Sequence, residues 1–561
     1  MSRRDGGVAL VLVLLLVVLA GTAIGPSFAP AATPSPSPTP APAVGHVEGV
    51  LGRPSSITPL TARTQADRDL VALLFRGLVR LGPGTSILPD LADSWTVGDK
   101  GATWTFHLRD GSLWHDGVPV SSADVVYTIQ VLQDPGYDGA LGAAWAGVRV
   151  TAVDERTVRF ELGDPVGGFL QAATLPLLPA HLLADVPASA LADDAYARQP
   201  IGNGSFALVS LTDAAAVLEP VLPSVVEAVG PAPNPAPGAL DPRTPRLARL
   251  ELRFFDTAEA LAAAFAAGEV GSAADLPGTA AMSLVAATPG TRAIRYPGTT
   301  LTAVAFDLRS PKGSFADKRV RRALAAALDR AALIDELLGG AGARADTPIP
   351  PSSWAYDAKA APPIVYDRTA AADGLKAAGW KRVDRQWYPP GAKKPLEISL
   401  LAPERSANPV VYEAARRVAA SWTALGLATT VEALDPGEFV ARLRAGDFTA
   451  AVVDVNMGLD PDPYPILGST QVREGGSNIA GFQDAALDAA LLAARAPGSM
   501  AARRKAYGSL QQLLGSLQPM VTLFFRDTVF VVGANLAGPV PRPVADPGDR
   551  FWDVVRWIAG R

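Results

Sequence analysis

The chain has 561 residues, 48% of them hydrophobic, and this length exceeds one ordinary hydrophobic core, so two or more lobes are expected. Its formal net charge of −5 gives no basic footprint, and nucleic acid is therefore excluded as an expected partner. The absence of cysteine excludes disulfides, thiol chemistry and cysteine-ligated zinc, and the four histidines are scattered, so neither a metal site nor another cofactor is expected.

The N-terminal region has the pattern of an exported protein. Two arginines precede an apolar run from Val8 to Ala20, which is typical of a secretory signal and short for a membrane span. We expect residues 1–29 to be a signal peptide, or else an uncleaved signal anchor. Residues 30–45 alternate proline with small residues and predict an extended linker, either a stalk or a disordered leader. Without cysteine, a lipoprotein anchor is excluded.

The stretch at 87–128 predicts a β-hairpin followed by a helix. Apolar and polar residues alternate between 103 and 108, which is the pattern of a half-buried strand, and Asp-Lys-Gly at 99–101 is typical of a turn. Ser121 stands three residues before an aspartate, the spacing of a capping box at a helix N-terminus. We expect that helix to end at the Asp-Pro pair at 134–135.

Similar patterns predict the other elements. An amphipathic helix is expected at 67–80 and a second hairpin at 148–162. A Pro-, Gly- and Ala-rich insertion at about 219–245 is expected to be a surface excursion without chemistry. The strongest helical pattern runs from Asp317 to Gly339. The remaining predictions are strands at 250–255, 301–308, 396–401 and 450–455, and helices at 257–268, 366–380, 410–425 and 439–446.

The helix predicted at 317–339 carries several arginines. Arg319, Arg322 and Arg330 could suggest an anion site, but Asp329 and Glu336 lie near them in the sequence. A mixed set of charges on one helix is typical of a solvated face. We therefore expect these arginines to face solvent.

Several segments resemble one known family. They read PDLADSW at 89–95, TWTFHLRDGSLWHDGVPV at 103–120 and SSADVVYT at 121–128. The sequences VDERTVRFEL and DKRVRRALAAALDRAALIDELLGG follow later in the matching order. Together they resemble solute-binding protein family 5, the oligopeptide-, dipeptide- and nickel-type receptors of bacterial ABC importers.

The resemblance implies an α/β, two-lobed, periplasmic-binding-protein-like fold of the class II type. An extra signature subdomain on lobe 1 and two crossover segments that form a hinge belong to this fold. The implied boundaries are lobe 1 at 46–297 with the signature subdomain at about 61–170, lobe 2 at 298–520, and a return to lobe 1 at 521–561. The two crossovers are expected near 296–302 and 518–524.

The implied function is that of an extracytoplasmic receptor, periplasmic or on the cell surface. It would capture a solute between closing lobes and deliver it to the membrane permease subunits of an ABC importer. Peptides are the expected ligand, a monomer is the expected state, and no enzymatic activity is expected because the sequence has no nucleophile elbow, P-loop or HExxH motif. The alternatives are the same fold with a non-peptide solute, such as a nickel chelate, a glycan or an opine-like compound, or a tethered sensor or interaction module without transport.

The expected ligand-binding residues lie mainly between Asn456 and Tyr464, where an Asp-Pro-Asp-Pro sequence follows a predicted strand. The resemblance implies that Asp460 takes the amino group of a peptide and that Asp462 braces the loop. Asn203 joins this set because its Gly-Asn-Gly turn resembles a family landmark. The loop departs from the family pattern, since the usual tryptophan is absent and the aspartate spacing is one residue short. It remains open that both aspartates only shape a turn.

Overall fold

The computed structural model describes residues 45–139, 141–221, 245–473 and 475–560. The expected signal segment, the linker before Gly45 and most of the insertion at 219–245 lie outside the described residues. Within the described ranges, no helix combines the length and the apolar character that crossing a membrane requires.

The first large sheet has seven strands in the order β12-β21-β11-β1-β10-β9-β8. β1 pairs in parallel with β10 and β11, whereas β8, β9, β12 and β21 are joined to their neighbours by antiparallel pairings. The strands are β1 (His46–Leu51), β8 (Phe206–Leu211), β9 (Ala215–Pro220), β10 (Leu250–Phe255), β11 (Ser272–Ala274), β12 (Arg292–Tyr296) and β21 (Thr528–Val532).

Helices cover both faces of this sheet. Because successive residues of a strand point to opposite faces, Val529 and Val531 of β21 pack in the core that α7 (Ala258–Ala266) and α8 (Gly278–Ala287) share. Phe530 and Val532 instead belong to the core that includes α2 (Gln65–Leu74) and the C-terminal 3-10 segment η6 (Pro547–Arg556).

The signature subdomain contains a four-stranded sheet in the order β4-β5-β7-β6. The expected hairpins are confirmed as β4 (Ala92–Gly98) with β5 (Thr103–Leu108), and β6 (Val148–Asp154) with β7 (Thr157–Leu162). The expected capping box is also confirmed, because Ser121 caps α3 (Ser122–Gln133) and the Asp124 carboxylate returns to the Ser121 backbone. The shorter elements here are β2 (Val79–Leu81), β3 (Ile87–Pro89), α4 (Gly142–Trp145), α5 (Phe169–Ala172) and α6 (Ala180–Leu183).

The helix expected at 67–80 is wrong at its C-terminal end. α2 stops at Leu74, and Phe75 has extended backbone angles of φ −128° and ψ 155°. Val79 then begins β2, which pairs with β3. Leu78 and Val79 are buried. A helix that continued to residue 80 would also bury apolar residues at this spacing, so hydrophobic spacing alone did not distinguish a helical continuation from a short strand.

The second large sheet has six strands in the order β14-β20-β13-β19-β17-β18. Val304 and Phe306 of β13 face the helices α9 to α12, whereas Leu301 and Ala303 face α15 and α16. The strands are β13 (Thr300–Phe306), β14 (Gly342–Arg344), β17 (Glu397–Pro403), β18 (Ala428–Leu434), β19 (Ala450–Asn456) and β20 (Val521–Arg526). The helices are α9 (Lys318–Ala326), α10 (Arg330–Leu338), α11 (Arg368–Ala377), α12 (Pro409–Leu425), α13 (Pro436–Ala445), α14 (Tyr464–Leu467), α15 (Ala485–Arg495) and α16 (Met500–Leu517).

The single helix expected from Asp317 to Gly339 is two helices, α9 and α10. Asp329 interrupts the helical path and caps α10 by accepting a hydrogen bond from Ala332 N at 3.0 Å. The interruption turns Arg330 inward, where its guanidinium donates to the carbonyl oxygens of Ala345 and Thr522. The expectation that Arg330 faces solvent was therefore wrong, because these buried carbonyls provide its acceptors.

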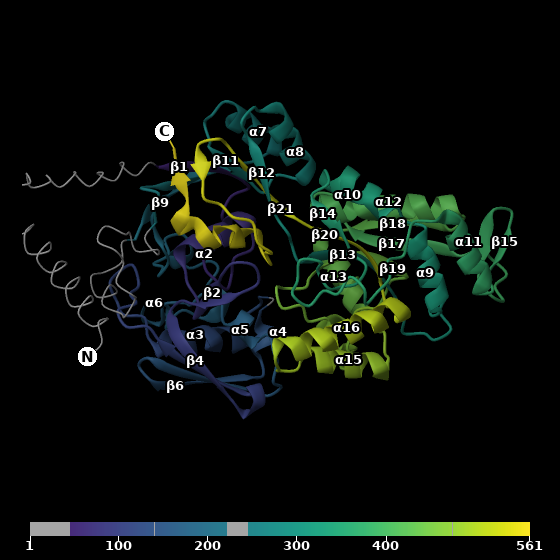
Figure 1. Ribbon diagram of the computed structural model, residues 1–561, viewed down its shortest axis with the longest axis horizontal. Coiled ribbons are helices and arrows are strands. Elements are labelled where there is room, and N and C mark those ends of the chain that lie inside the picture. Colours follow the sequence, from purple (N-terminus) through teal and green to yellow (C-terminus); the bar gives the residue numbers. More distant parts are fainter. Residues whose placement is uncertain (1–44, 140, 222–244, 474, 561) are drawn as a thin grey trace, which may run out of the picture. The chain divides into compact units, whose positions relative to one another are not determined.

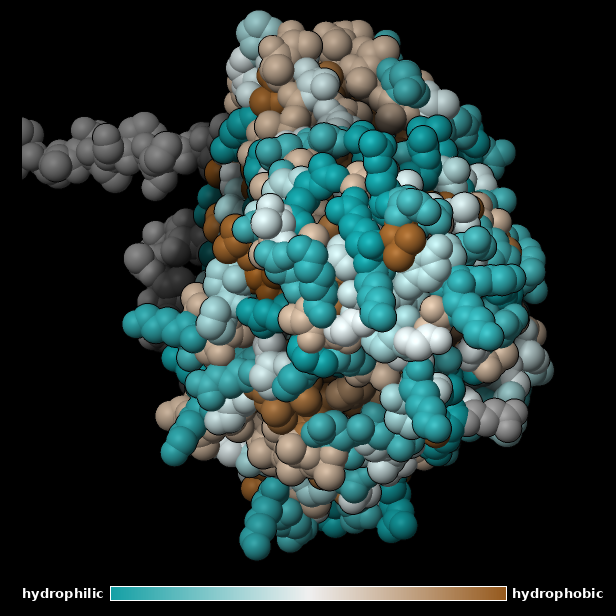
Figure 2. Space-filling view, turned by 90° about the vertical axis from the view of Figure 1, so that its right-hand side faces the viewer, coloured by the Kyte–Doolittle hydropathy of each residue, from teal (hydrophilic) through white to brown (hydrophobic). Residues whose placement is uncertain are grey.

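The face that carries α11 and the β15 (Lys381–Val383) and β16 (Gln386–Tyr388) hairpin is largely hydrophilic (Figure 2). The exposed apolar side chains include Val383 of β15 and the neighbouring Val365 and Tyr366 just before α11. A few exposed apolar residues are ordinary on a soluble surface.

Two short connections join the large sheets (Figure 1). The first runs from Pro297 to Thr299, between β12 and β13. The second is Asp527, between β20 and β21, and it lies beyond the expected 518–524 because β20 stays paired with β14 as far as Arg526. The connections touch, since a Cβ built on Gly298 would lie 1.9 Å from the Arg526 carbonyl oxygen.

Candidate functional site

The expected ligand-binding segment begins beside the first connection. Asn456, the last residue of β19, accepts hydrogen bonds at Oδ1 from Thr299 Oγ1 at 2.7 Å and from Gly458 N at 2.9 Å. Its Nδ2 donates to the Ala545 carbonyl oxygen at 2.7 Å. Ala545 follows β21 of the first sheet, so the Asn456 amide links the end of a second-sheet strand to the C-terminal part of the chain.

Asp460 forms a two-pronged ion pair with Arg503 of α16. The distances are 2.7 Å from Nη1 to Oδ2 and 2.6 Å from Nη2 to Oδ1. Arg503 also lies over the rings of Trp354 and Tyr507, with its guanidinium carbon 4.7 and 5.9 Å from their centroids. The Asp460 carboxylate, whose side chain is 16% exposed, is therefore held in one orientation by a cation of the same chain.

Asp462 and Tyr464 form a second group with Arg495 of α15. Asp462 pairs with Arg495 at 3.1 Å, and its Oδ1 accepts a hydrogen bond from Tyr464 N at 3.0 Å. The Arg495 guanidinium carbon lies 4.4 Å from the centroid of the Tyr464 ring. Burial raises the pKa of Asp462, against the opposing charge of Arg495. These contacts fix the loop that follows Asp460.

The signature subdomain reaches this segment through the loop before α5. Gly167 N donates to the Arg495 carbonyl oxygen at 2.8 Å. A Cβ built on Gly168 would lie 3.2 Å from Asp460 Cγ, closer than most real Cβ contacts. The loop can therefore approach the Asp460 carboxylate closely because it has no side chain there.

Sequence reasoning missed Arg495, Arg503 and the glycine pair at 167–168. Arg503 lies 43 residues after Asp460, and Gly168 lies on a different subdomain. Motif spacing carries no information about such distant pairs, and these residues therefore had no local signal in the sequence.

Asn203 lies apart from this group. Its Oδ1 accepts a hydrogen bond from Arg76 N at 2.7 Å, and its own backbone N–H donates to the Leu74 carbonyl oxygen at 3.0 Å. Both partners lie at the end of α2, so these bonds tie the Gly-Asn-Gly turn to that helix rather than to Asp460.

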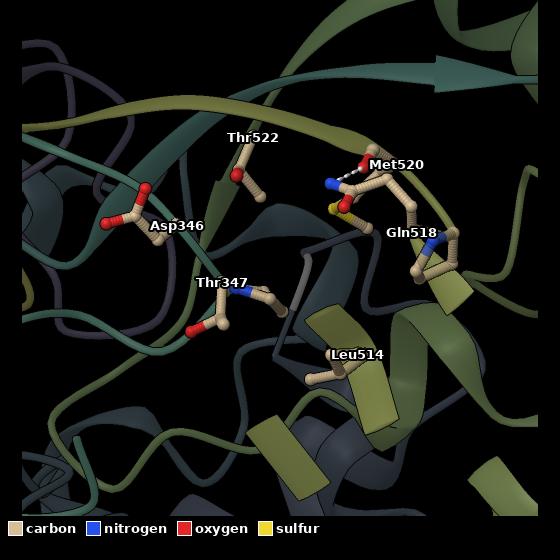
Figure 3. A pocket seen from close by; sticks show the side chains of 8 residues that line it. Asp346, Thr347, Leu514, Gln518, Met520 and Thr522 are labelled. Carbon is tan, nitrogen blue, oxygen red and sulfur yellow. Dashed lines mark hydrogen bonds between the residues drawn. The ribbon is translucent and has the colours of Figure 1, made fainter. Parts of the chain in front are cut away.

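A small pocket lies beside β20 and α16 (Figure 3). Figure 3 shows the Gln518 side chain turned to the Met520 carbonyl oxygen, to which its Nε2 donates at 3.2 Å. The space is about that of one water molecule, which is too small for a peptide. Among the described residues, no group of three or more histidine or carboxylate side chains is placed to hold a metal ion. The lining residues are Asp346, Thr347, Pro348, Leu514, Gln518, Pro519, Met520 and Thr522.

The second connection carries a carboxyl group with a shifted pKa. Burial raises the pKa of Asp527 to about 6, although Arg295 and a hydrogen bond from the Gly298 backbone act in the opposite direction. Because the folded pKa lies above the unfolded value of about 3.9, the protonated form favours folding. The stability that this group contributes is complete below pH 4 and is lost as the pH rises through about 6.

Asp527→Asn should therefore stabilise the protein at neutral pH. Its advantage over the wild type is expected to grow by about 1–2 kcal/mol between pH 5 and pH 7.5. Chemical denaturation at the two pH values measures this difference. The control is Asp373→Asn, which removes an exposed pair with Lys376 and should change stability by less than about 1 kcal/mol at either pH. Parallel pH profiles for wild type and Asp527→Asn would contradict the prediction.

Comparison with known proteins places the chain in a family. Residues 86–477 match the family described as "Bacterial extracellular solute-binding proteins, family 5 Middle". The oligopeptide-binding protein AppA of Bacillus subtilis is 24% identical over 528 residues, which cover 91% of each chain. A dipeptide-binding protein of Pseudomonas aeruginosa is 26% identical over 513 residues, 85% of this chain and 89% of the relative.

A solved structure gives the same assignment at the level of the fold. The structure of Bacillus subtilis AppA in complex with a nonapeptide has a TM-score of 0.72 and 23% sequence identity, and it covers 93% of this chain and 100% of the other. The two sheets and their two connections therefore form the expected two-lobed fold. The family match extends over more than half of the sequence, and the chain belongs to the bacterial extracellular solute-binding proteins of family 5.

Proposed function

We propose that this protein binds peptides between its two lobes and delivers them to the permease of an ABC importer. The observation that carries the proposal is the position of the Asn456–Tyr464 segment. It leaves the second sheet beside the first connection and meets a loop of the signature subdomain at Gly168. A ligand held there would contact both lobes, and closure around it would draw its free energy from contacts made only in the closed state.

The names of the relatives support peptides as the ligand class. One is called an oligopeptide-binding and another a dipeptide-binding protein. Peptides can be held largely by main-chain hydrogen bonds, which leaves side-chain pockets free to diverge. The low identity of these relatives is compatible with a shared ligand class and different side-chain preferences.

Asp460 is the proposed partner of the peptide's amino group. Arg503 donates one hydrogen bond to each oxygen of the Asp460 carboxylate, and each oxygen retains a further lone pair for an ammonium group. Asp462, Tyr464 and Asn456 would hold the loop in position through the contacts described above. Asn203, also expected in the ligand set, would act on the turn at the end of α2.

Asp460→Asn should weaken the binding of peptides with a free amino terminus by about tenfold. The reason is the loss of one charge-assisted hydrogen bond, worth about 1.5 kcal/mol. Isothermal titration with a peptide and with its N-acetylated form measures the effect, and the acetylated form should bind wild type and variant equally. An equal loss of affinity for both forms would assign Asp460 a structural role only. In that case the loss would arise because the variant leaves the buried Arg503 with a neutral partner.

The ligand class itself is tested by native mass spectrometry of protein purified from its own host. Receptors that close around a solute release it slowly, so bound material should survive purification. We expect a series of masses that differ by amino-acid residues and that disappears on denaturation. A single retained non-peptide compound, such as a metal chelate, would replace peptides as the ligand.

The expected partners and location complete the proposal. Export would use the apolar segment at 1–29, and the proline-rich residues at 30–45 would tether or lead the folded body. The protein would act as a monomer and dock on permease subunits when closed. Membrane fractionation of the host tests the location. Crosslinking to the permease with and without peptide tests the docking.

A further inference from the structure

The β15–β16 hairpin and the chain on either side of it form a strongly basic surface. Six of the 19 residues from 376 to 394 are lysine or arginine and one is acidic, although the whole chain has a net charge of −5. All six cations are exposed. We call this surface the basic tip, and its cations are Lys376, Lys381, Arg382, Arg385, Lys393 and Lys394.

Packing and hydrogen bonds fix the basic tip on the second lobe. Trp387 of β16 is fully buried, and its Nε1 donates to the carbonyl oxygen of Leu425, the last residue of α12, at 3.0 Å. Leu396 N donates to the Trp387 carbonyl oxygen at 3.1 Å and closes the loop that carries the last two lysines. A Cβ built on Gly379 would lie 3.4 Å from Pro390 Cγ, so this loop packs against the end of α11. The cations therefore project from an ordered backbone, and binding through them costs little further ordering.

Most of the positive charge of the basic tip has no counter-charge in the folded protein. Lys376 pairs with Asp373 at 3.0 Å, and among the described residues the other five cations have no ion-pair partner. Both side chains of that one pair are more than half exposed, and such pairs are weak. By contrast, Arg416 and Arg417 of α12 each pair with a glutamate. The basic tip thus differs from an ordinary surface of interspersed charges and is suited to an anionic partner.

An apolar side chain lies at the end of the hairpin. Val383 is 48% exposed and directly precedes the two-residue turn. Lys381 pairs with Tyr388 and Val383 with Gln386, so Lys381 and Val383 lie on the same face of the hairpin. Figure 2 shows hydrophilic side chains extending from the surface that carries this hairpin. Cations and an apolar side chain on one face match the interface of a membrane, where phosphate groups lie above acyl chains.

We propose that the basic tip binds an anionic phospholipid bilayer. Clusters of about 4–8 cations attract such a surface, and each cation close to it contributes about fivefold to partitioning. The chain belongs to a family of extracellular proteins, so the outer surface of a membrane is within its reach. This inference goes beyond the proposed function, because it does not depend on the ligand. Bound in this way, the receptor is confined to the surface at which a permease lies, where its effective concentration is higher.

A fluorescent probe at the hairpin tests the contact directly. Because the chain has no cysteine, Val383→Cys provides a single site for an environment-sensitive fluorophore in the full-length protein. Its emission should shift to shorter wavelength with vesicles of phosphatidylglycerol and phosphatidylcholine in equal amounts, and not with phosphatidylcholine alone. A probe at this position reports on the basic tip whatever the N-terminal segment binds. The matched control Val440→Cys labels an exposed valine of α13 and should show no shift.

Two charge-matched variants, each carrying the probe at residue 383, assign the attraction to the cations of the basic tip. Four substitutions there should lower the affinity for anionic vesicles at least about tenfold at about 0.15 M salt. The control removes four exposed lysines elsewhere and should keep the affinity within about twofold, because charges more than a Debye length from the lipid are screened. Arg382 is retained because its guanidinium carbon lies 5.7 Å from the centroid of the Trp387 ring. The tip variant is Lys381→Gln, Arg385→Gln, Lys393→Gln and Lys394→Gln, and the control is Lys100→Gln, Lys312→Gln, Lys359→Gln and Lys505→Gln.

Three results would overturn the proposal. They are no shift of the Val383→Cys probe with anionic vesicles, an equal shift with neutral vesicles, and an equal loss of affinity in the two charge variants. Crosslinking of the basic tip to a permease subunit without any response to vesicles would replace the lipid with a protein partner. If the tip variant does not fold, as thermal unfolding would reveal, wild-type binding that persists at about 1 M salt overturns the role of the cations. None of these measurements uses a peptide, so their failure leaves the proposed function intact.

Discussion

Arg550→Met is expected to lower the free energy of unfolding by about 3–5 kcal/mol, because it removes the cation that pairs with two buried carboxylates. Arg550 is fully buried and lies between Asp69 and Glu48. Its Nη1 and Nη2 donate to the two Asp69 oxygens at 2.6 and 2.5 Å, and Nη2 also donates to Glu48 at 2.6 Å. Methionine fills a similar volume without any donor.

A third buried carboxylate, that of Asp275, adds a pH dependence to this prediction. Burial raises the pKa of Asp275 well above its ordinary range, with Asp69 adding to the shift and Arg550 opposing it. Burial also raises the pKa of Glu48, and Arg550 again opposes the shift. Removing the guanidinium leaves these acids facing one another, so the variant should regain part of its stability as the pH falls and they become protonated.

Chemical denaturation at pH 7.5 and pH 5 measures the effect of Arg550→Met. The control is Arg53→Met, which removes an exposed pair with Asp256 and should cost less than about 1 kcal/mol. The triple variant Arg550→Met, Glu48→Gln, Asp69→Asn should recover part of the loss, because the two carboxylates that pair with Arg550 are then replaced by neutral amides. A loss below about 1 kcal/mol for Arg550→Met would show that the carboxylates do not depend on Arg550.

The sequence predicted elements whose determinants are local. The β4–β5 hairpin follows from alternation between 103 and 108, and the α3 N-terminus follows from Ser121 and Asp124, which lie within one helical turn. The break before α10 is also local, but Asp329 can either cap a helix or occupy an exposed position within one. What decided between these was the inward turn of Arg330 toward the Thr522 carbonyl, a partner 192 residues away.

The candidate site likewise has a part that local sequence could indicate and a part that it could not. The resemblance to family 5 predicted a ligand-binding role for the segment between Asn456 and Tyr464, because that segment follows a strand in a known order. It did not indicate that Arg503 pairs with Asp460 or that Ala545 meets Asn456, since both contacts join elements distant in the chain. Such contacts depend on how strands are ordered in a sheet, and no spacing within a segment records that order.

Gly298→Ala is expected to weaken peptide binding by about a hundredfold. Gly298 lies in the first connection, and an added Cβ would lie 1.9 Å from the Arg526 carbonyl oxygen and 3.2 Å from the Arg526 carbonyl carbon. Both are backbone atoms of the last residue of β20, directly before the second connection, so no side chain can rotate away. The two connections would have to separate, at a cost of about 3 kcal/mol, and this cost would fall on the closed state that binds the ligand.

Isothermal titration and thermal unfolding of the same variant separate two origins of this loss. If the clash strains the hinge, affinity falls about a hundredfold, and the bound protein loses more thermal stability than the free protein, because the open state can relax. The control Gly147→Ala adds a Cβ that meets nothing within 4 Å and should change neither quantity. Unchanged affinity for Gly298→Ala would mean that the connections move apart freely, and the closure of the lobes would then have to occur about another part of the chain.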